Sequence, residues 1–142
     1  MGESRPSQSA APRGTGSALA ALSVSSFAFD SMTPFEKALV AHLIGDWLLQ
    51  NNWMALNKQK LSHPAAWVHS SIQAVLLGLA LGWRGGVVLG AVHLLVDTGV
   101  PVNWWVRTFK KCDGAPHALL IRIWTDQVIH IAAIALWVTL VP

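Results

Sequence analysis

The sequence predicts an all-α protein, a polytopic transmembrane bundle of four helices that follows a disordered amino-terminal tail. Of its 142 residues, 53% are hydrophobic and only 12% are charged, whereas soluble domains carry about 25% charged residues. Four apolar stretches follow residue 32, and each is close to the ~20 residues that a helix needs to cross a bilayer. The net charge of +3 comes without a long basic run, so we expect contact with the lipid bilayer and no nucleic-acid partner.

Residues 1–31 and 32–142 differ in composition, which indicates two parts. The first part is rich in Ser, Ala, Gly and Pro and lacks helical periodicity, so we expect a disordered tail or an upstream extension. Met32 is followed by TPFEKALVAH, which is typical of a chain start, with Thr33 as helix N-cap and Pro34 at the first helical position. We therefore assign the four-helix transmembrane domain to residues 32–142.

The helices are expected over residues 34–54, 65–83, 87–105 and 117–140. A polar segment ending at Pro64 and a turn at Arg84–Gly86 separate the first three. Gly99 and Pro101 should break the third helix just after Asp97. Trp residues lie near most helix ends, as in the aromatic belts of membrane proteins, and the basic residues of the first and third loops predict a cytoplasmic location for those loops.

Three of the seven acidic residues lie well inside these helices, and each has a histidine four positions away. The pairs are His42 with Asp46, His93 with Asp97, and Asp126 with His130. A four-residue offset places both members of a pair on one helix face. In an up-down-up-down bundle, the reversed order in the last helix puts the three histidines at one depth and the three aspartates about 6 Å away. His69 of the second helix falls near the aspartate depth, one turn before Gln73.

These residues predict a buried metal site. A charged side chain near the bilayer centre costs about 2.5–3.5 kcal/mol on insertion scales, so three aspartates need partners. Imidazole and carboxylate groups from several helices suit Zn, Mn, Fe or Ni, among which the sequence does not choose. They could hold one ion, or two ions that share a carboxylate. A metal-free polar network and a tetrapyrrole ligated by histidine are the alternatives. The candidate metal ligands are His42, Asp46, His69, His93, Asp97, Asp126 and His130.

The segments AHLIGDWLLQNNWMALNK, HLLVD and DQVIH, together with His69, resemble the domain-of-unknown-function 3307 family of small bacterial membrane proteins. The resemblance extends from Thr33 to Leu140 and implies a multi-pass protein of the bacterial cytoplasmic membrane. After Asp97 the family often continues with an aromatic residue and a lysine, whereas this chain has TGVPVNWW. The resemblance implies a fold and a set of polar residues without implying a reaction. Those residues are His42, Asp46, Gln50, Lys58, His69, His93, Asp97, Asp126, Gln127 and His130.

Three functions fit this pattern. The first is a metal-dependent hydrolase acting on a lipid-like or membrane substrate, in which the ion activates water and Asp126 or Asp97 serves as general base. The second is a non-enzymatic accessory subunit of a larger membrane complex, or a homo-oligomer, whose polar core is structural or ligates a cofactor. The third is ion or proton relay along the His and Asp side chains.

Overall fold

The computed structural model describes residues 31–112 and 114–141, and within these ranges all regular secondary structure is helical. The all-α class is therefore confirmed for this part of the chain. The tail expected over residues 1–31 lies outside the described residues apart from Ser31. The helices are α2 (Pro34–Leu43), the π-helix η1 (Ile44–Leu49), α3 (Asn52–Asn57), α4 (Pro64–Asp97), α5 (Val100–Trp105), the π-helix η2 (Val106–Lys110) and α6 (Ala118–Leu140).

The first expected helix begins where predicted but is divided before its end. The backbone N–H of Thr33 donates to the Glu36 carboxylate at 2.6 Å, and the Glu36 N–H donates back to the Thr33 hydroxyl at 3.3 Å, which forms a capping box. The helix widens into η1 and ends at Leu49, because Gln50 adopts extended backbone angles. The Asn51 side chain then accepts the Met54 N–H at 3.0 Å and starts α3 as a separate helix.

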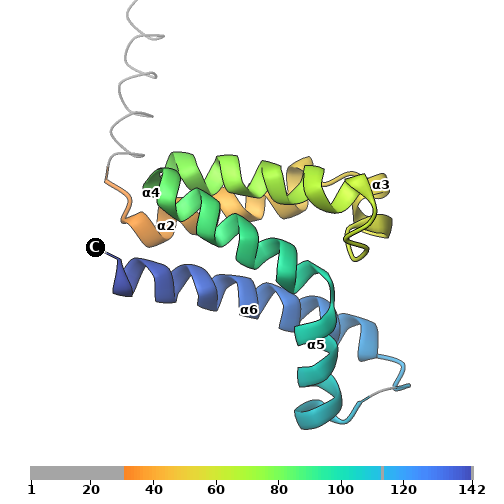
Figure 1. Ribbon diagram of the computed structural model, residues 1–142. Helices are drawn as coiled ribbons and strands as arrows, with labels where there is room; N and C mark the ends of the chain where they lie inside the picture. The colour runs from red at the N-terminus through yellow and green to blue at the C-terminus, as the bar shows by residue number, and fades with distance from the viewer. Residues whose placement is uncertain (1–30, 113, 142) are drawn as a thin grey trace, which may run out of the picture. The chain divides into compact units, whose positions relative to one another are not determined.

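α4 is a hairpin of two helical arms. Gly82, inside α4, has non-helical backbone angles (φ 80°, ψ 166°), and the ribbon of α4 doubles back on itself (Figure 1). The arms, residues 64–81 and 83–97, are joined across the hairpin by the Ser70 hydroxyl, which donates to the Gly90 carbonyl oxygen at 2.7 Å. The reversal therefore lies at Gly82, before the Arg84–Gly86 turn that the sequence led us to expect.

Some glycines of the hairpin allow close packing of the arms and another forms the turn. This difference explains the position of the turn. A Cβ added at Gly86 would lie 2.5 Å from the Ala74 carbonyl oxygen, and one at Gly90 would lie 2.6 Å from the Ala74 Cβ. Gly86 and Gly90 are therefore needed for close packing of the arms. Gly82 has open space around its Cβ position and a positive φ, which glycine adopts at little cost.

α2 and α6 both pack against the α4 hairpin and against each other. Near the hairpin turn they enclose an apolar cluster of Ala38, Ala41, Leu77, Leu89 and Ile134. A second apolar cluster, of Val96, Val102 and Val106, forms where α5 and η2 meet the end of α4. Along the second arm of α4, the histidine at position 93 falls between these two clusters. The polar residues of the candidate site thus lie between two small apolar cores.

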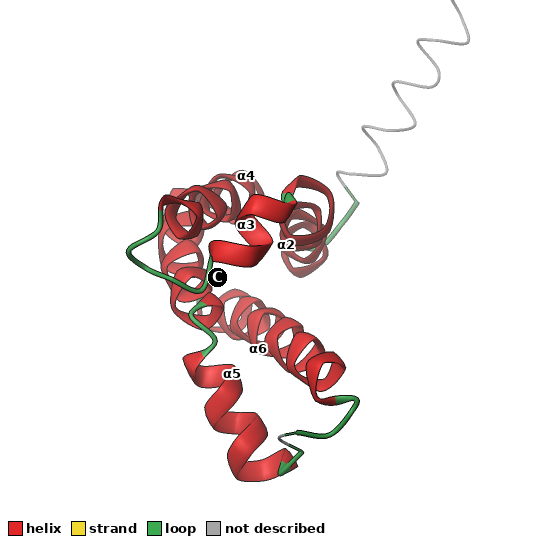
Figure 2. Ribbon diagram, turned by 90° about the vertical axis from the view of Figure 1, so that its right-hand side faces the viewer, coloured by secondary structure: helices red, strands yellow, loops and turns green. Residues whose placement is uncertain are grey.

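The expected break after Asp97 is present. Gly99 adopts a left-handed conformation (φ 74°), and Val100 begins α5 with Pro101 in its first turn. Figures 1 and 2 show that α5 runs in a different direction from the second arm of α4. The chain continues from α5 as helix through η2.

Among the described residues, α4 and α6 are long and apolar enough to cross a membrane, by length and composition, and the length of α4 is divided between the two arms of its hairpin. In the most apolar stretch of 18 residues in each helix, only 28% of the stretch is buried in α4 and 17% in α6. The core helix of a soluble domain buries most of its apolar surface. Leu79 and Trp83 are 81% and 74% exposed. An apolar environment around these helices would cover this surface.

Candidate metal centre

Four imidazoles and two carboxylates meet between α2, η1, the α4 hairpin and α6. Each of the six side chains belongs to a residue that is at most 6% exposed. α2 supplies His42, η1 supplies Asp46 and α6 supplies His130. The two arms of α4 supply the other three, His69, His93 and Asp97. The structure therefore brings together six of the seven candidate ligands. In chain order they are His42, Asp46, His69, His93, Asp97 and His130.

Four ligand atoms form the tightest part of this cluster. Nε2 of His69 lies 3.2 Å from Oδ1 of Asp46 and 3.2 Å from Oδ2 of Asp97. Nε2 of His93 lies 3.5 Å and 3.1 Å from the same two oxygens. The two Nε2 atoms are 3.0 Å apart. Two nitrogens from the two arms of α4 thus each lie close to an oxygen of both carboxylates. We call these four side chains the primary site.

The distances from the two imidazole nitrogens are close to those between the ligands of one metal ion. Zinc bonds of about 2.0–2.1 Å to nitrogen and oxygen give ligand-to-ligand distances of about 3.3–3.4 Å in a tetrahedron. Each imidazole nitrogen of the primary site lies 3.0–3.5 Å from the other and from one oxygen of each carboxylate. Among the described residues, no group of ligand atoms within 4.8 Å of one another contains both Asp46 and Asp97. Between two neutral imidazoles only one nitrogen can donate a proton to the other. A cation placed between His69 and His93 would satisfy both lone pairs and both carboxylates at once.

Two glutamine amides hold Asp46 in place. Nε2 of Gln73 donates to Oδ1 of Asp46 at 2.6 Å and to the His42 carbonyl oxygen at 3.1 Å. Nε2 of Gln127 donates to Oδ2 of Asp46 at 2.7 Å. Such hydrogen bonds from a second layer of side chains fix the orientation of a ligating carboxylate. The sequence places Gln73 one turn after His69, and the family resemblance includes Gln127; in the structure both hold Asp46.

We expect Gly45→Ala to weaken metal binding through Gln73. A Cβ at Gly45 would overlap the side-chain amide of Gln73, so that amide must leave Asp46. Loss of a second-layer partner lowers metal affinity by about 10–100-fold. Competition for Zn²⁺ against a chromophoric chelator measures the effect. The matched control is Gly78→Ala, whose added Cβ meets its nearest neighbour at 3.6 Å. Equal affinities in the two variants would exclude this role for Gln73.

Lys58 reaches the primary site from the loop that follows α3. Its Nζ lies 2.9 Å from Oδ1 of Asp97 and 3.4 Å from Nε2 of His69. Helical periodicity could not reveal Lys58, because it lies outside the long helices and its contact with Asp97 spans 39 positions of sequence. The family resemblance did include it among the polar residues.

A polar cavity of about 470 Å³ opens beside the primary site. It lies on the side of α3 and α5, and Asp46 and Asp97 form part of its wall. Apolar side chains, Trp47, Leu119 and Ile123, line another part. The cavity is therefore amphipathic and gives access to the cluster. Its other polar lining residues include Gln50, Lys58, Asn103, Arg122, Asp126 and Gln127.

The opposite side of the cluster is closed. His42, His93 and His130 rest on the apolar core at Leu77, Leu89 and Ile134, with a gap of about 10 Å³. A gap of this size holds about one water molecule at most. Within the described part of the protein, the cluster is thus reached from the polar cavity on the side of α3 and α5.

Asp126 stands apart from the other candidate ligands. It is not a member of the groups of ligand atoms that lie within 4.8 Å of one another. Its neighbour Gln127 takes the inward position on α6, and one residue corresponds to about 100° around a helix. The Asp126 carboxylate therefore lines the polar cavity, with Oδ2 at 3.6 Å from Nδ1 of His130.

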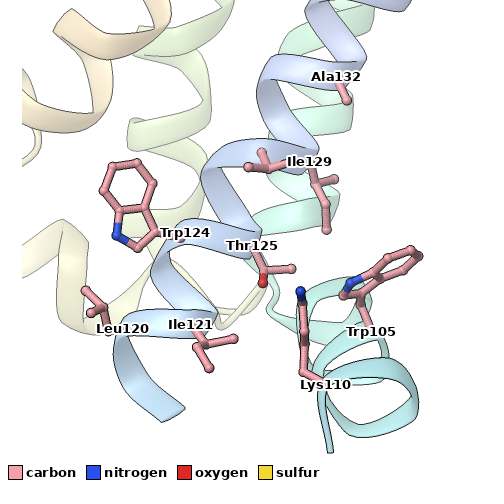
Figure 3. A pocket seen from close by; sticks show the side chains of 9 residues that line it. Trp105, Lys110, Leu120, Ile121, Trp124, Thr125, Ile129 and Ala132 are labelled. Atoms are coloured by element: carbon pink, nitrogen blue, oxygen red, sulfur yellow. The ribbon is translucent and has the colours of Figure 1, made fainter. Parts of the chain in front are cut away.

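A larger groove, of about 560 Å³, lies between η2 and α6 and does not belong to this site. Trp105, Trp124 and Ile129 are among its mostly apolar lining residues, with Lys110 at the edge (Figure 3). None of the seven candidate ligands lines it. Among the described residues, Asp46, Asp97 and Asp126 line the polar cavity instead.

The described residues thus define an all-helical protein with a buried cluster of His and Asp side chains that could hold a metal ion. The sequence profile of a family described as protein of unknown function (DUF3307) matches residues 35–141. The chain belongs to this family, which confirms the resemblance seen in its motifs. No curated protein and no solved structure matches the chain.

Proposed function

We propose that this protein is an integral membrane, metal-dependent hydrolase that acts on a lipid-like substrate. One observation carries the proposal: the Nε2 atoms of His69 and His93 lie 3.0–3.5 Å from each other and from an oxygen of both Asp46 and Asp97, buried beside a polar cavity. The ion is a divalent transition metal held by His69, His93, Asp46 and Asp97. Mixed nitrogen and oxygen ligands suit Zn, Mn, Fe or Ni.

Four helical segments cross the membrane in this proposal: α2 with η1, the two arms of α4, and α6. At 1.5 Å per residue the arms of α4 are about 27 Å and 22 Å long. Both are shorter than the hydrocarbon core of about 30 Å, so this proposal requires local thinning of the bilayer around the hairpin. Lys58 and Lys60 follow α3, and Arg107 and Lys110 belong to η2, which continues α5. α3 and α5 both contribute to the end of the bundle where the polar cavity opens. The positive-inside rule places that end of the bundle, and the mouth of the cavity, on the cytoplasmic side.

The side chains of the cavity have separate roles in hydrolysis. With water as a fifth ligand, a divalent ion held by the four side chains of the primary site would lower the pKa of that water towards neutrality and would so supply a nucleophile. Asp126 faces the cavity without joining the primary site, so it takes the role of general base. Asp97, the other candidate base, contacts His69, His93 and Lys58 at 2.9–3.2 Å and serves as a ligand. Lys58 and Arg122 place positive charge where negative charge develops on the substrate.

The cavity favours an amphiphilic substrate. Its polar side chains surround the ligands, while Trp47, Leu119 and Ile123 form an apolar wall. A molecule with an ester or amide next to an acyl chain could place the scissile bond at the ion and the chain against this wall. The apolar closure behind His42 and His130 argues against a relay, which needs polar groups at both ends of its path.

The test separates metal binding from turnover. Protein purified in mild detergent and loaded with Zn²⁺ or Mn²⁺ is incubated with phospholipids, acyl esters and a hydrophobic peptide, and mass spectrometry detects the products. We expect turnover by the wild type. Asp126→Asn should keep the metal and lose more than about 100-fold in rate, while Asp97→Asn should lose both. Full activity of Asp126→Asn would rule out its role as base. Fully loaded protein that cleaves no substrate would favour the accessory-subunit function.

A further inference from the structure

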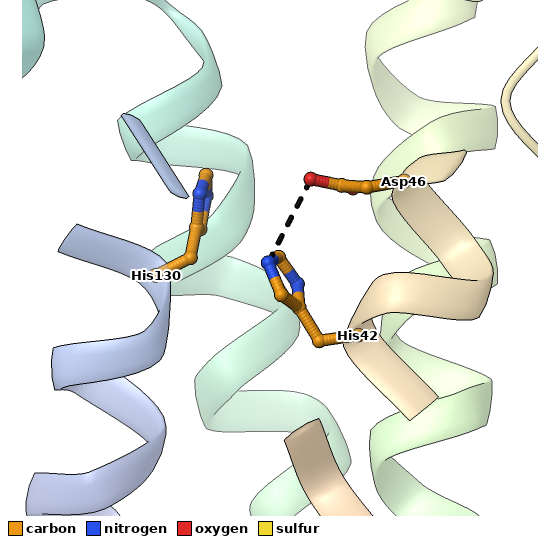
Figure 4. Close-up of side chains that lie close together, drawn as sticks. All are labelled: His42, Asp46 and His130. Atoms are coloured by element: carbon orange, nitrogen blue, oxygen red, sulfur yellow. Dashed lines mark ion pairs between the residues drawn. The ribbon is translucent and has the colours of Figure 1, made fainter. Parts of the chain in front are cut away.

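We propose that the cluster holds a second divalent ion, bound by His42, His130 and Oδ2 of Asp46, so that Asp46 bridges two ions. The proposal rests on the metal centre proposed above and extends it from one ion to two. The three side chains come from α2, η1 and α6, and face one another in Figure 4. One ligand atom of each lies within 4.8 Å of the others.

The first argument is that both nitrogens of His42 and both nitrogens of His130 are buried without a hydrogen-bond partner among the described residues. His42 is 0% and His130 3% exposed. The carboxylate oxygen closest to His42 Nε2 is Oδ2 of Asp46, at 3.7 Å. The one closest to His130 Nδ1 is Oδ2 of Asp126, at 3.6 Å. Both distances are too long for a hydrogen bond. A buried polar atom left without a partner costs about 1–3 kcal/mol, so these imidazoles need another ligand.

The second argument is the way Asp46 divides its two oxygens. Oδ1 faces His69 and His93 of the primary site, whereas Oδ2 is the oxygen nearest His42. A carboxylate can therefore offer one oxygen to each of two ions without rotating. Two-metal hydrolytic sites commonly stabilise the attacking and leaving oxygens of a reaction between ions about 3.5–4 Å apart.

Binding of the second ion requires the side-chain amide of Gln127 to change its orientation. Its Nε2 now donates to Oδ2 of Asp46 at 2.7 Å, while its buried Oε1 has no hydrogen-bond partner among the described residues. A half-turn of the amide exchanges a donor for an acceptor. That turn frees Oδ2 and presents the Gln127 oxygen as a fourth ligand beside His42 and His130. The unpartnered Oε1 is thus consistent with a site that is completed when the ion binds.

Counting ions tests the proposal. The full chain in mild detergent is stripped with a chelator, reloaded with excess Zn²⁺, separated from free ion and measured by elemental analysis. We expect two zinc ions per chain in the wild type and one in His42→Ala and His130→Ala. His117→Ala is the control, because His117 is an exposed histidine outside the cluster, and it should retain two. One zinc per wild-type chain would overturn the second ion and leave the primary site intact, whereas none would overturn both.

Because a buried alanine substitution can prevent folding, a second measurement uses the wild type alone. Stripped protein is titrated with Co²⁺, whose visible absorption bands report ligation by nitrogen and oxygen. A break in absorbance at two equivalents supports the proposal, and a break at one equivalent contradicts it. His130→Gln, which keeps a polar side chain of similar reach, should move the break from two equivalents to one.

Discussion

Asp46→Asn is expected to empty the metal centre and to have the largest effect of any substitution in the cluster. Asp46 contacts His69 and His93 through one oxygen and lies nearest His42 through the other. Asparagine removes the negative charge and one of the two acceptor oxygens. We expect a loss of Zn²⁺ affinity beyond the ~10–100-fold that removal of a second-layer group causes.

The same substitution should also lower stability. Gln73 and Gln127 each donate to a different oxygen of Asp46, and asparagine can accept only one of these bonds without rearrangement. An unsatisfied buried amide costs about 1–3 kcal/mol, so the unfolding midpoint should fall. Zinc content and thermal unfolding in detergent measure the two effects separately.

The control for Asp46→Asn is Glu36→Gln. Glu36 is an exposed acid in the same amino-terminal helical segment, so the change in net charge is identical, and glutamine preserves the capping box with Thr33. The control should keep its zinc. A folded Asp46→Asn protein that binds as much zinc as Glu36→Gln would remove Asp46 from the ligand set.

The sequence predicts most of this cluster because helical spacing converts directly into geometry. His42 and Asp46, or His93 and Asp97, must share a helix face once the helix forms. The positions of Gln127 and Asp126 could not be separated in this way, because one residue of rotation decides which of them faces Asp46. The approach of Lys58 to Asp97 depends on a loop, where spacing carries no such information.

The fold shows the same division between local and tertiary effects. Thr33, Pro34 and Gly99 act through local backbone preferences, and the helix boundaries beside these three residues appear where the sequence predicts them. The hairpin turn depends instead on which glycines the arms need for packing. Gly82, Gly85 and Gly86 look equivalent as turn residues in the sequence. Only the approach of Ala74 and Gly78 shows that Gly86 belongs to the contact between the arms.

Gly86→Ala should therefore destabilise the hairpin and the metal centre together. A Cβ at this position would lie 2.5 Å from the Ala74 carbonyl oxygen and 2.7 Å from the Gly78 Cα. Both are backbone atoms, so one arm must move away from the other. Overpacking of this kind costs about 1–3 kcal/mol, which exceeds the ~1 kcal/mol that alanine gains over glycine within a helix.

The displacement should reach the ion because the two arms carry His69 and His93, whose Nε2 atoms are 3.0 Å apart. We expect a lower unfolding midpoint and weaker Zn²⁺ binding in Gly86→Ala. Gly78→Ala is a close control, since it adds the same methyl group to the facing position, where the nearest atom lies at 3.6 Å. That variant should be as stable as the wild type or more so. If the two alanine variants unfold at the same temperature, Gly86 is not the contact that sets the distance between the arms, and the spacing of the two histidines must depend on α2 and α6 instead.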